Sequence, residues 1–245
     1  MPKTILITGG SRGIGRATAV LFARQGWNVA LSFVGNQQSA DETCALCERA
    51  GITGNAFARK CDVRDETSVV NFFNSARERF GSIDGVINNA GIVAPKSALA
   101  DMDIERMKNV FDTNVLGAYL VAREAARTLQ SGGSLVNVSS IAAKLGSPGE
   151  YVDYAGSKGA IDTLTIGLAR ELGPKGIRVN AVRPGIINTE IHASGGRPER
   201  VVELGPACPL GRPGKADEVA QSIYWLTSDA ASYVTGSIID VSGGR

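Results

Sequence analysis

Short apolar runs alternate with longer amphipathic segments along almost the whole chain. The runs predict buried strands, and the segments between them repeat with the period of about 3.6 residues that is typical of helices. The predicted strands are Thr4–Thr8, Asn28–Phe33, Asn55–Lys60, Gly85–Asn88, Ser134–Ser139, Arg178–Arg183 and Ser237–Val241. The predicted helices are Gly13–Gln25, Ser39–Ala50, Asp65–Phe80, Ile104–Leu129, Val152–Gly173 and Ala216–Leu226. This alternation predicts an α/β fold whose parallel sheet is covered on both faces and binds ligands at the carboxyl ends of its strands.

The segment 187–215 interrupts this alternation. It is rich in Gly and Pro, as in Gly195-Gly196 and Gly211-Arg212-Pro213-Gly214, and it is long for a simple connection. Loops of this length inside compact domains are usually functional or disordered. We expect it to form a mobile lid over the active site. Its mixture of acidic and basic side chains with few aromatic ones favours a polar substrate, such as a sugar, over a long acyl chain.

Composition narrows the class of protein. A chain of 245 residues with 43% hydrophobic and 20% charged residues suits a single globular domain. Its net charge of +2 and lack of a basic block argue against nucleic acid as a partner. The sequence has no charged leader followed by an apolar core, and no apolar run of about 18 residues, so we expect a cytoplasmic protein without a membrane partner.

The four cysteines are too few for a disulfide framework in a chain of this length: Cys44, Cys47, Cys61 and Cys208. The pair Cys44 and Cys47 lies in a helical pattern, with no second pair or histidine nearby to complete a zinc site. We therefore expect core packing and no metal. His192 is the sole histidine, so a serine-hydrolase triad could not be assembled without it. Because it lies in the expected lid, we expect His192 to be a substrate-side or surface residue.

A glycine-rich turn follows the first predicted strand and precedes the first predicted helix. It reads Thr8-Gly9-Gly10-Ser11-Arg12-Gly13-Ile14-Gly15. Glycines allow a pyrophosphate to approach the backbone closely, and the helix N-terminus offers free N–H groups. Such a turn taken alone could also be a plain tight turn. Its position between a strand and a helix favours a phosphate-binding site.

Tyr154 and Lys158 are four residues apart in a predicted helix, so their side chains lie on one face. Ser140 precedes the tyrosine by fourteen residues, and Asn114 lies further upstream. Acid–base chemistry near neutral pH requires the tyrosine pKa to fall by about three units, or roughly 4 kcal/mol. A cation about 5 Å away at an effective dielectric constant of about 20 supplies roughly 3 kcal/mol. Taken singly, such residues are more often caps or packing residues.

The ordered set of motifs resembles the short-chain dehydrogenase/reductases of the classical type. Besides the glycine turn, Ser140, Tyr154 and Lys158, it includes Asp62-Val63, Asn88-Asn89-Ala90-Gly91, Asn114, Pro184-Gly185 with Thr189, and Tyr233-Val234-Thr235-Gly236. The chain looks most like the bacterial branch that contains 3-oxoacyl carrier protein reductases and glucose dehydrogenases. The resemblance implies one Rossmann-type domain over residues 1–245, with a doubly wound, parallel, seven-stranded sheet.

The resemblance also implies a role for each residue. Tyr154 would exchange a proton with the substrate oxygen, Lys158 would lower the tyrosine pKa and hold the nicotinamide ribose, and Ser140 would hydrogen-bond the substrate. Asn114 would position a water that relays protons toward Lys158. The implied cofactor-binding residues are Gly9, Ser11, Arg12, Gly13, Ile14, Gly15, Phe33, Asp62, Val63, Asn89, Ala90, Gly91, Tyr154, Lys158, Pro184, Gly185, Ile187 and Thr189.

The end of the second strand indicates which dinucleotide is used. NAD enzymes of this architecture place a carboxylate there, whereas this chain has Phe33. Arg12 lies in the glycine turn, where a guanidinium can bind a 2′-phosphate, although a solvated turn residue is the alternative. A second basic residue after the strand is missing. We expect NADP(H) to be preferred, with NAD(H) still usable.

The leading hypothesis is an NADP(H)-dependent oxidoreductase acting on a carbonyl or secondary alcohol. One alternative is a catalytically silent dinucleotide-binding sensor or structural protein of the same fold. Another is a dehydratase or epimerase that uses the same cofactor. Relatives with those activities usually have a larger C-terminal substrate region, whereas little of this chain follows the lid. The resemblance and the apolar residues of Val152–Gly173 also predict a homotetramer. One of its interfaces would be formed by the helices Ile104–Leu129 and Val152–Gly173. The other would be formed by the last helix and the strand Ser237–Val241.

Overall fold

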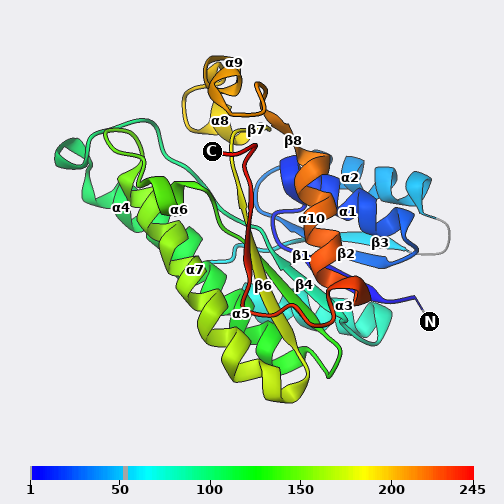
Figure 1. Cartoon of the computed structure of the whole chain (residues 1–245). Helices are drawn as coiled ribbons and strands as arrows, with labels where there is room; N and C mark the ends of the chain where they lie inside the picture. Colours follow the sequence, from blue (N-terminus) through cyan, green and yellow to red (C-terminus); the bar gives the residue numbers. More distant parts are fainter. Residues whose placement is uncertain (1, 52–54) are drawn as a thin grey trace.

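The computed structural model describes residues 2–51 and 55–245. Seven parallel strands form one sheet in the order β3-β2-β1-β4-β5-β6-β9, with helices on both faces (Figure 1). The strands are β1 (Thr4–Ile7), β2 (Asn28–Phe33), β3 (Ala56–Lys60), β4 (Gly85–Asn88), β5 (Ser134–Val138), β6 (Arg178–Pro184) and β9 (Ile238–Val241). The main helices are α1 (Gly13–Arg24), α2 (Gln37–Ala50), α3 (Glu66–Phe80), α4 (Ile104–Phe111), α5 (Gly117–Thr128), α6 (Ala142–Leu145), α7 (Val152–Leu172) and α10 (Ala216–Thr227). The predicted fold class is confirmed.

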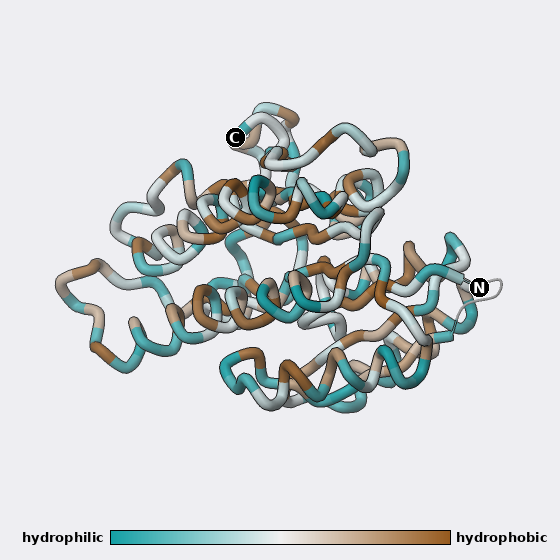
Figure 2. The backbone as a smooth tube through the Cα atoms, turned by 90° about the horizontal axis from the view of Figure 1, so that it is seen from below, coloured by the Kyte–Doolittle hydropathy of each residue, from teal (hydrophilic) through white to brown (hydrophobic). Residues whose placement is uncertain are grey.

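Two apolar layers hold the helices on the sheet. Because side chains alternate between the two faces of a strand, Ile5 and Ile7 of β1 pack beneath α1, α2 and α10, whereas Leu6 packs on the other face with α3, α5 and α7. All three residues are fully buried. The alternation of hydrophobic strands with helices of mixed hydropathy is visible in Figure 2.

The long helix predicted for Ile104–Leu129 is wrong in one respect. The structure contains α4 and α5, joined by a π-helical segment at Asp112–Leu116. This segment carries Asn114, which is 1% exposed. A π turn is rare, and it is frequently found at functional sites. Apolar periodicity cannot reveal it, because the residues on either side keep a helical pattern.

A chain of buried side-chain hydrogen bonds fixes α7 against the sheet. Asn88 of β4 donates through Nδ2 to Asn137 Oδ1 of β5 at 3.0 Å and to Ala118 O of α5 at 2.9 Å. Asn137 Nδ2 in turn donates to Thr165 Oγ1 of α7 at 2.9 Å. Nearer the carboxyl ends, Ser139 Oγ donates to Lys158 O at 3.1 Å. These contacts fix the height of α7 relative to β4 and β5.

The segment 187–215 is not a featureless loop. It contains β7 (Ile187–Asn188) and β8 (Gly214–Lys215), which pair in parallel, and between them the short helices α8 (Ile191–Ser194) and α9 (Arg200–Leu204). It lies above the carboxyl ends of the strands in Figure 1. The segment therefore lies at the edge where ligands of such sheets bind, and its role as a mobile lid stays a prediction.

The cysteine side chains pack in the interior. Burial raises the pKa of Cys44 to about 11 and that of Cys47 to about 12. Both thiols of this pair therefore stay protonated at neutral pH, as expected of packing residues rather than reactive ones. None of the helices in residues 2–51 and 55–245 is long and apolar enough to cross a membrane.

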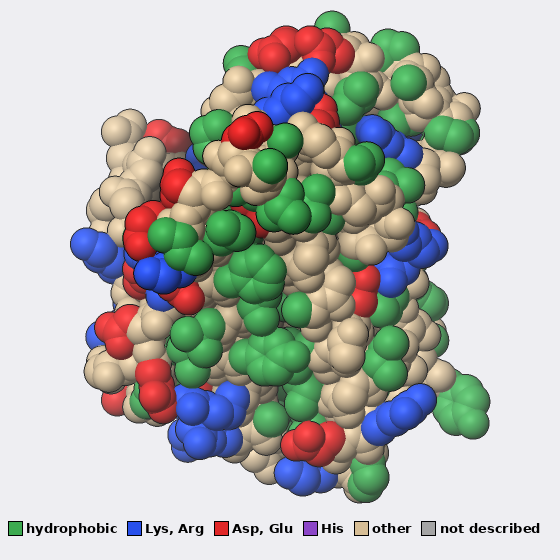
Figure 3. Space-filling view, turned by 90° about the vertical axis from the view of Figure 1, so that its left-hand side faces the viewer, with side chains coloured by type: hydrophobic (Ala, Val, Ile, Leu, Met, Phe, Trp, Pro, Cys, Tyr) green, Lys and Arg blue, Asp and Glu red, His purple; other side chains and the backbone are tan. Residues whose placement is uncertain are grey.

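Large apolar side chains also gather on an outer face. Figure 3 shows hydrophobic side chains grouped on the side of the molecule that carries α4 and α7. The exposed apolar residues of α4, the π segment, α5 and α7 are Ile104, Phe111, Leu116, Tyr119 and Ile166. By contrast, Ile161 and Leu164 of α7 face the sheet and are buried. Exposed apolar patches of this kind are typical of interaction surfaces.

We predict that Asn137→Ala lowers the free energy of unfolding by about 3 kcal/mol, because an N–H group of Asn88 and the hydroxyl of Thr165 each lose a buried partner. Urea denaturation at fixed protein concentration measures the change. Asn71→Ala on the exposed face of α3 is the control and should cost less than about 0.5 kcal/mol. Equal losses of unfolding free energy in the two variants would show that the buried hydrogen bonds of Asn137 contribute nothing to stability.

Candidate active site

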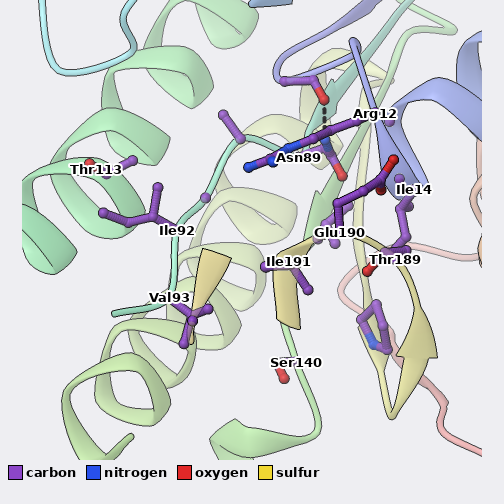
Figure 4. Close-up of a pocket in the computed structure, with 18 of the residues that line it drawn as sticks. Arg12, Ile14, Asn89, Ile92, Val93, Thr113, Ser140, Thr189, Glu190 and Ile191 are labelled. Atoms are coloured by element: carbon purple, nitrogen blue, oxygen red, sulfur yellow. Dashed lines mark hydrogen bonds between the residues drawn. The ribbon is translucent and has the colours of Figure 1, made fainter. Parts of the chain in front are cut away.

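A cavity of about 680 Å³ opens at the carboxyl ends of the strands. It extends from the ends of β2 and β3, past the glycine turn and β4, to α7 and the segment 187–215, and Figure 4 shows part of it. Every residue predicted to bind cofactor lines it, as do Ser140, Tyr154 and Lys158. Asn114 does not line the cavity but lies buried behind it.

The glycine turn is held by side chains from neighbouring strands. Asn89 Nδ2 donates to Thr8 O at 2.9 Å and to Gly9 O at 3.1 Å, and Ser32 Oγ accepts from Gly9 N at 3.2 Å. A Cβ on Gly15 would lie 2.3 Å from Gly9 O, so this position admits only glycine. The first turn of α1 thereby presents its free N–H groups to the cavity, beside Arg12, Ile14 and Asn89 (Figure 4).

The far end of the cavity is lined by residues after β2 and β3. Phe33 is 5% exposed and forms part of the wall, and the residues that follow it there are uncharged: Val34, Gly35, Asn36 and Ser39. Asp62 and Val63 come from the end of β3. Arg64 binds Asp62 through Nη2–Oδ2 at 2.6 Å, and this hydrogen bond lowers the pKa of Asp62. The carboxylate is therefore charged and fixed.

Tyr154, Ser140 and Lys158 lie together at the other end. Lys158 Nζ donates to Val138 O at 2.9 Å and lies 5.7 Å from the centroid of the Tyr154 ring. Burial lowers the pKa of Lys158 to about 8, and the charge of Asp162 opposes this shift. Lys158 is therefore mostly cationic at pH 7 and neutral well above pH 8.

The pKa of Tyr154 differs from the sequence-based expectation. Burial raises it above the ordinary value of a tyrosine, and the hydrogen bond with Ser140 lowers it by less. The expected depression assumed a water-like cost for forming a phenolate, whereas burial makes the anion more expensive. The Lys158 ammonium also faces the ring, and its hydrogen bond is to Val138 O. Tyr154 is thus a protonated donor in this state of the protein.

Asn114 connects the π segment to the loop that follows β4 and to α7. Its Oδ1 accepts from Ile92 N at 2.8 Å, and its Nδ2 donates to Ile92 O at 2.9 Å and to Ser157 Oγ at 3.1 Å. A Cβ on Gly91 would lie 3.3 Å from both Asn114 Oδ1 and Lys158 Nζ. The two groups therefore border the same small space, although they make no direct hydrogen bond among the described contacts.

The segment after β6 completes the wall. Pro184, Gly185, Ile187 and Thr189 line the cavity beside Tyr154. His192 contacts Ile187 O through Nε2 at 2.9 Å, and burial lowers the pKa of the imidazole despite that hydrogen bond. His192 is therefore neutral at pH 7 and lines the cavity, and a role for it on the substrate side stays a prediction.

Sequence reasoning missed several lining residues. Ser32 holds the glycine turn and Arg64 holds Asp62, and the only signal for Arg64 was its adjacency to Asp62-Val63. Glu190 and Arg200 also line the cavity. Their roles depend on contacts with distant segments, which a local pattern does not contain.

The residues present fit a nicotinamide dinucleotide. The turn at Gly15 leaves no room for a side chain where a pyrophosphate would approach the backbone, and the carboxylate of Asp62 is fixed at the far end of the same elongated cavity. Tyr154 and Lys158 lie at the opposite end. The glycine turn with Asp62 and the Tyr154–Lys158 pair are therefore separated along the cavity.

Comparison with known proteins agrees with this geometry. The family profile described as Enoyl-(Acyl carrier protein) reductase matches residues 9–245. Uncharacterized oxidoreductase YgfF of Escherichia coli (strain K12) is 51% identical over 245 residues, covering 98% of each chain. A short-chain dehydrogenase from Burkholderia cenocepacia J2315 in complex with NADP is 32% identical, with a TM-score of 0.91 over 99% of this chain and 97% of its own.

A second solved structure lies in the predicted branch. The 3-ketoacyl-(acyl-carrier-protein) reductase from Brucella melitensis, complexed with NADH, is 29% identical, with a TM-score of 0.89 over 99% of this chain and 98% of its own. The family resemblance inferred from the motifs is thus confirmed. The chain belongs to the short-chain dehydrogenase/reductase family and is an oxidoreductase of CH–OH groups that works with a nicotinamide cofactor.

Proposed function

We propose that the protein interconverts a carbonyl compound and its secondary alcohol, of sugar, ketoester or 3-oxoacyl type, with NADP(H) as the preferred cofactor. The observation that carries this proposal is the convergence of Tyr154, Ser140 and Lys158 at one end of the cavity whose other end holds the glycine turn and Asp62. A screen of NADPH oxidation and NADP reduction with aldoses, β-ketoesters, quinones and acyl thioesters tests it.

The bound nicotinamide would supply or accept the hydride. Tyr154 donates its phenolic proton to the carbonyl oxygen during reduction, and the raised pKa keeps that proton in place at neutral pH. Ser140 donates to or orients the same oxygen. Lys158 supplies the positive charge that stabilises the phenolate left after proton transfer. That charge is present below a pH of about 8 and is lost above it.

Asn114 is a positioning residue in this proposal. Its amide fixes the Ile92 backbone and Ser157, and it borders the space next to Lys158 Nζ. A water in that space would connect Lys158 to the interior, so that the proton lost from Tyr154 is replaced. The π segment is what turns Asn114 toward α7.

The adenosine end supports NADP(H). The residues that line the cavity from Phe33 to Ser39 carry no carboxylate that would repel a 2′-phosphate. Arg12 lines the same region, and no partner for its side chain occurs among the described hydrogen bonds. A guanidinium binds phosphate through charge-assisted hydrogen bonds. The related structures bound to NADP and to NADH are consistent with use of either cofactor by this family.

The apolar outer face supports a homotetramer. Phe111 is 43% exposed and Ile166 is 41% exposed, and Figure 3 shows further hydrophobic side chains around the centre of this face. On the last helix Trp225 is 40% exposed, next to the edge strand β9. We propose that these two surfaces form the two-fold interfaces of a tetramer. The unlinked thiols among the described cysteines suit a cytoplasmic enzyme.

Tyr154→Phe should reduce kcat about 10²- to 10⁴-fold, because it removes the transferable proton but little volume. The affinity of Tyr154→Phe for NADPH, measured by fluorescence titration, should change little. Lys158→Met should lower both kcat and the affinity for NADPH. Tyr151→Phe, which also lines the cavity, is the control. Retention of more than about a tenth of wild-type turnover by Tyr154→Phe would refute the acid–base assignment.

Arg12→Ala should raise the Michaelis constant for NADPH much more than that for NADH, because it removes the cation that faces the 2′-phosphate. Phe33→Asp should shift the ratio of kcat/KM toward NADH. Lys60→Ala, an exposed cation at the end of β3, is the charge control and should alter neither ratio. A wild-type enzyme with higher kcat/KM for NADH than for NADPH would be incompatible with this assignment.

The double variant Phe111→Asp/Ile166→Asp should dissociate the tetramer into smaller species, because it buries charge in an apolar contact. Light scattering coupled to size exclusion reports the mass directly. Leu210→Asp, which is exposed elsewhere, is the control. A wild-type mass near 25.6 kDa at all concentrations would rule out the tetramer.

A further inference from the structure

Arg200 of α9 is a largely buried cation that lines the cavity beside the residues preceding α7. Its side chain is 12% exposed, and it lines the cavity. Its Nη1 donates to Glu150 Oε2 at 2.6 Å, and the guanidinium lies 4.9 Å from the centroid of the Tyr151 ring. Both contacts come from the residues that immediately precede α7. The guanidinium is therefore fixed in position against Tyr151, which precedes Tyr154 by three residues in the sequence.

Arg200 retains hydrogen-bond donors that no side chain uses. Within residues 2–51 and 55–245 its guanidinium makes one hydrogen bond, that to Glu150. A guanidinium carries five N–H donors in a planar fork. The Nε and Nη2 groups make no hydrogen bond to the described residues and are not among the buried atoms that lack a partner, so they stay partly accessible to solvent on a residue that lines the cavity.

Glu150 also pairs with other cations, so its negative charge is not available to neutralise Arg200 alone. It also pairs with Arg197 at 2.7 Å and with Lys96 at 3.8 Å. Burial raises the pKa of Glu150, but Arg200, Arg197 and Lys96 outweigh it and hold the pKa below its usual value. Figure 3 shows basic and acidic side chains clustered over this upper end of the molecule. Of this cluster, Arg200 is the member that lines the cavity.

The acidic groups of the cavity lie elsewhere. Asp62 is at the end of β3, and Glu190 lies beside Ile14 and Thr189, near the glycine turn (Figure 4). His192 is neutral, and Arg245 lines the cavity in addition to Arg12, Arg64 and Lys158. Beside these groups the wall carries the apolar side chains of Val93, Ile141, Leu145, Ile186 and Ile191, together with the polar residues Ser140 and Ser147.

We propose that Arg200 binds an anionic group of the substrate, so that the substrate is a carbonyl or alcohol joined by a short apolar spacer to a carboxylate or a phosphate. A planar guanidinium whose Nε and Nη2 donors are left unused by the described part of the chain suits either oxyanion through charge-assisted hydrogen bonds. The inference rests on the proposed function for the position of the reacting carbon. It makes Arg200 a specificity-determining residue, anchored by Glu150 and Tyr151.

The first test compares matched substrates. The ratio of kcat/KM is measured for 4-oxopentanoate against its methyl ester, for 3-oxobutanoate against its ethyl ester, and for dihydroxyacetone phosphate against dihydroxyacetone. The first two pairs report a carboxylate and the third a phosphate. In Arg200→Met the preference for the favoured anion should fall about 10- to 100-fold, as expected for a lost hydrogen bond to a charged group. Arg200→Lys should restore part of it.

Two arginines provide controls. Arg197→Met removes a partner of the same Glu150 but no group that lines the cavity, and Arg212→Met breaks the exposed pair with Glu218 in the same segment. Both should leave the ratio within about twofold. An equal loss in Arg197→Met and Arg200→Met would show that Arg200 only tethers the segment, and it would overturn the proposal. So would a wild-type preference for the uncharged partner in all three pairs.

A binding measurement separates this inference from the proposed activity. Saturation-transfer NMR and calorimetry compare pentanoate with pentanamide, and propyl phosphate with propanol, on the wild-type enzyme and on Arg200→Met. Tighter binding of an anion that is lost in Arg200→Met supports the anion site even if no ketone is reduced. Reduction of ketones without any such binding difference refutes the anion site and leaves the proposed function intact.

Discussion

The position of α7 on the sheet is the constraint on which the active site depends. Tyr154 and Lys158 share this helix, while Ser140 follows β5 and the glycine turn follows β1. Hydrogen bonds from Asn137 to Thr165, from Ser139 to Lys158 O and from Lys158 Nζ to Val138 O fix α7 in both height and rotation. Because the strands are parallel, their carboxyl ends share one edge, and a helix fixed to that edge brings Tyr154 and Lys158 to the same cavity as the glycine turn, as the proposed mechanism requires.

Local pattern was sufficient for most of the fold, and every residue predicted to bind the cofactor lines the cavity. Strands such as Asn28–Phe33 were predicted at their observed bounds, because a buried parallel strand is a continuous apolar run with clear ends. The Tyr154 and Lys158 pair was visible as a helical spacing. Asn114 was named as a site residue, yet the π turn that places it was not foreseen, since it is determined by packing against Ile92 and Ser157 rather than by its neighbours in sequence.

Electrostatics could not be predicted from spacing in the same way. The distance between Tyr154 and Lys158 suggested a lowered tyrosine pKa, but burial, which only the folded chain defines, outweighs it in the opposite direction. The same holds for Arg200 and Glu150, which are 50 residues apart in sequence and meet only because the segment 187–215 folds over the end of α7. Charged residues in a Gly- and Pro-rich segment otherwise resemble a solvated loop.

The π turn at Asp112–Leu116 also constrains how the chain can change in length. An α-helix rotates by about 100° per residue, so a π turn accommodates one extra residue while keeping the flanking helices in their places. Deleting one residue here would restore a regular helix and leave α4 and α5 in their places, but it would remove the turn that presents Asn114 to Ile92 and Ser157. The residue count of this segment is therefore fixed by Asn114, whereas the Gly132-Gly133 turn carries no such side chain and tolerates a change in length.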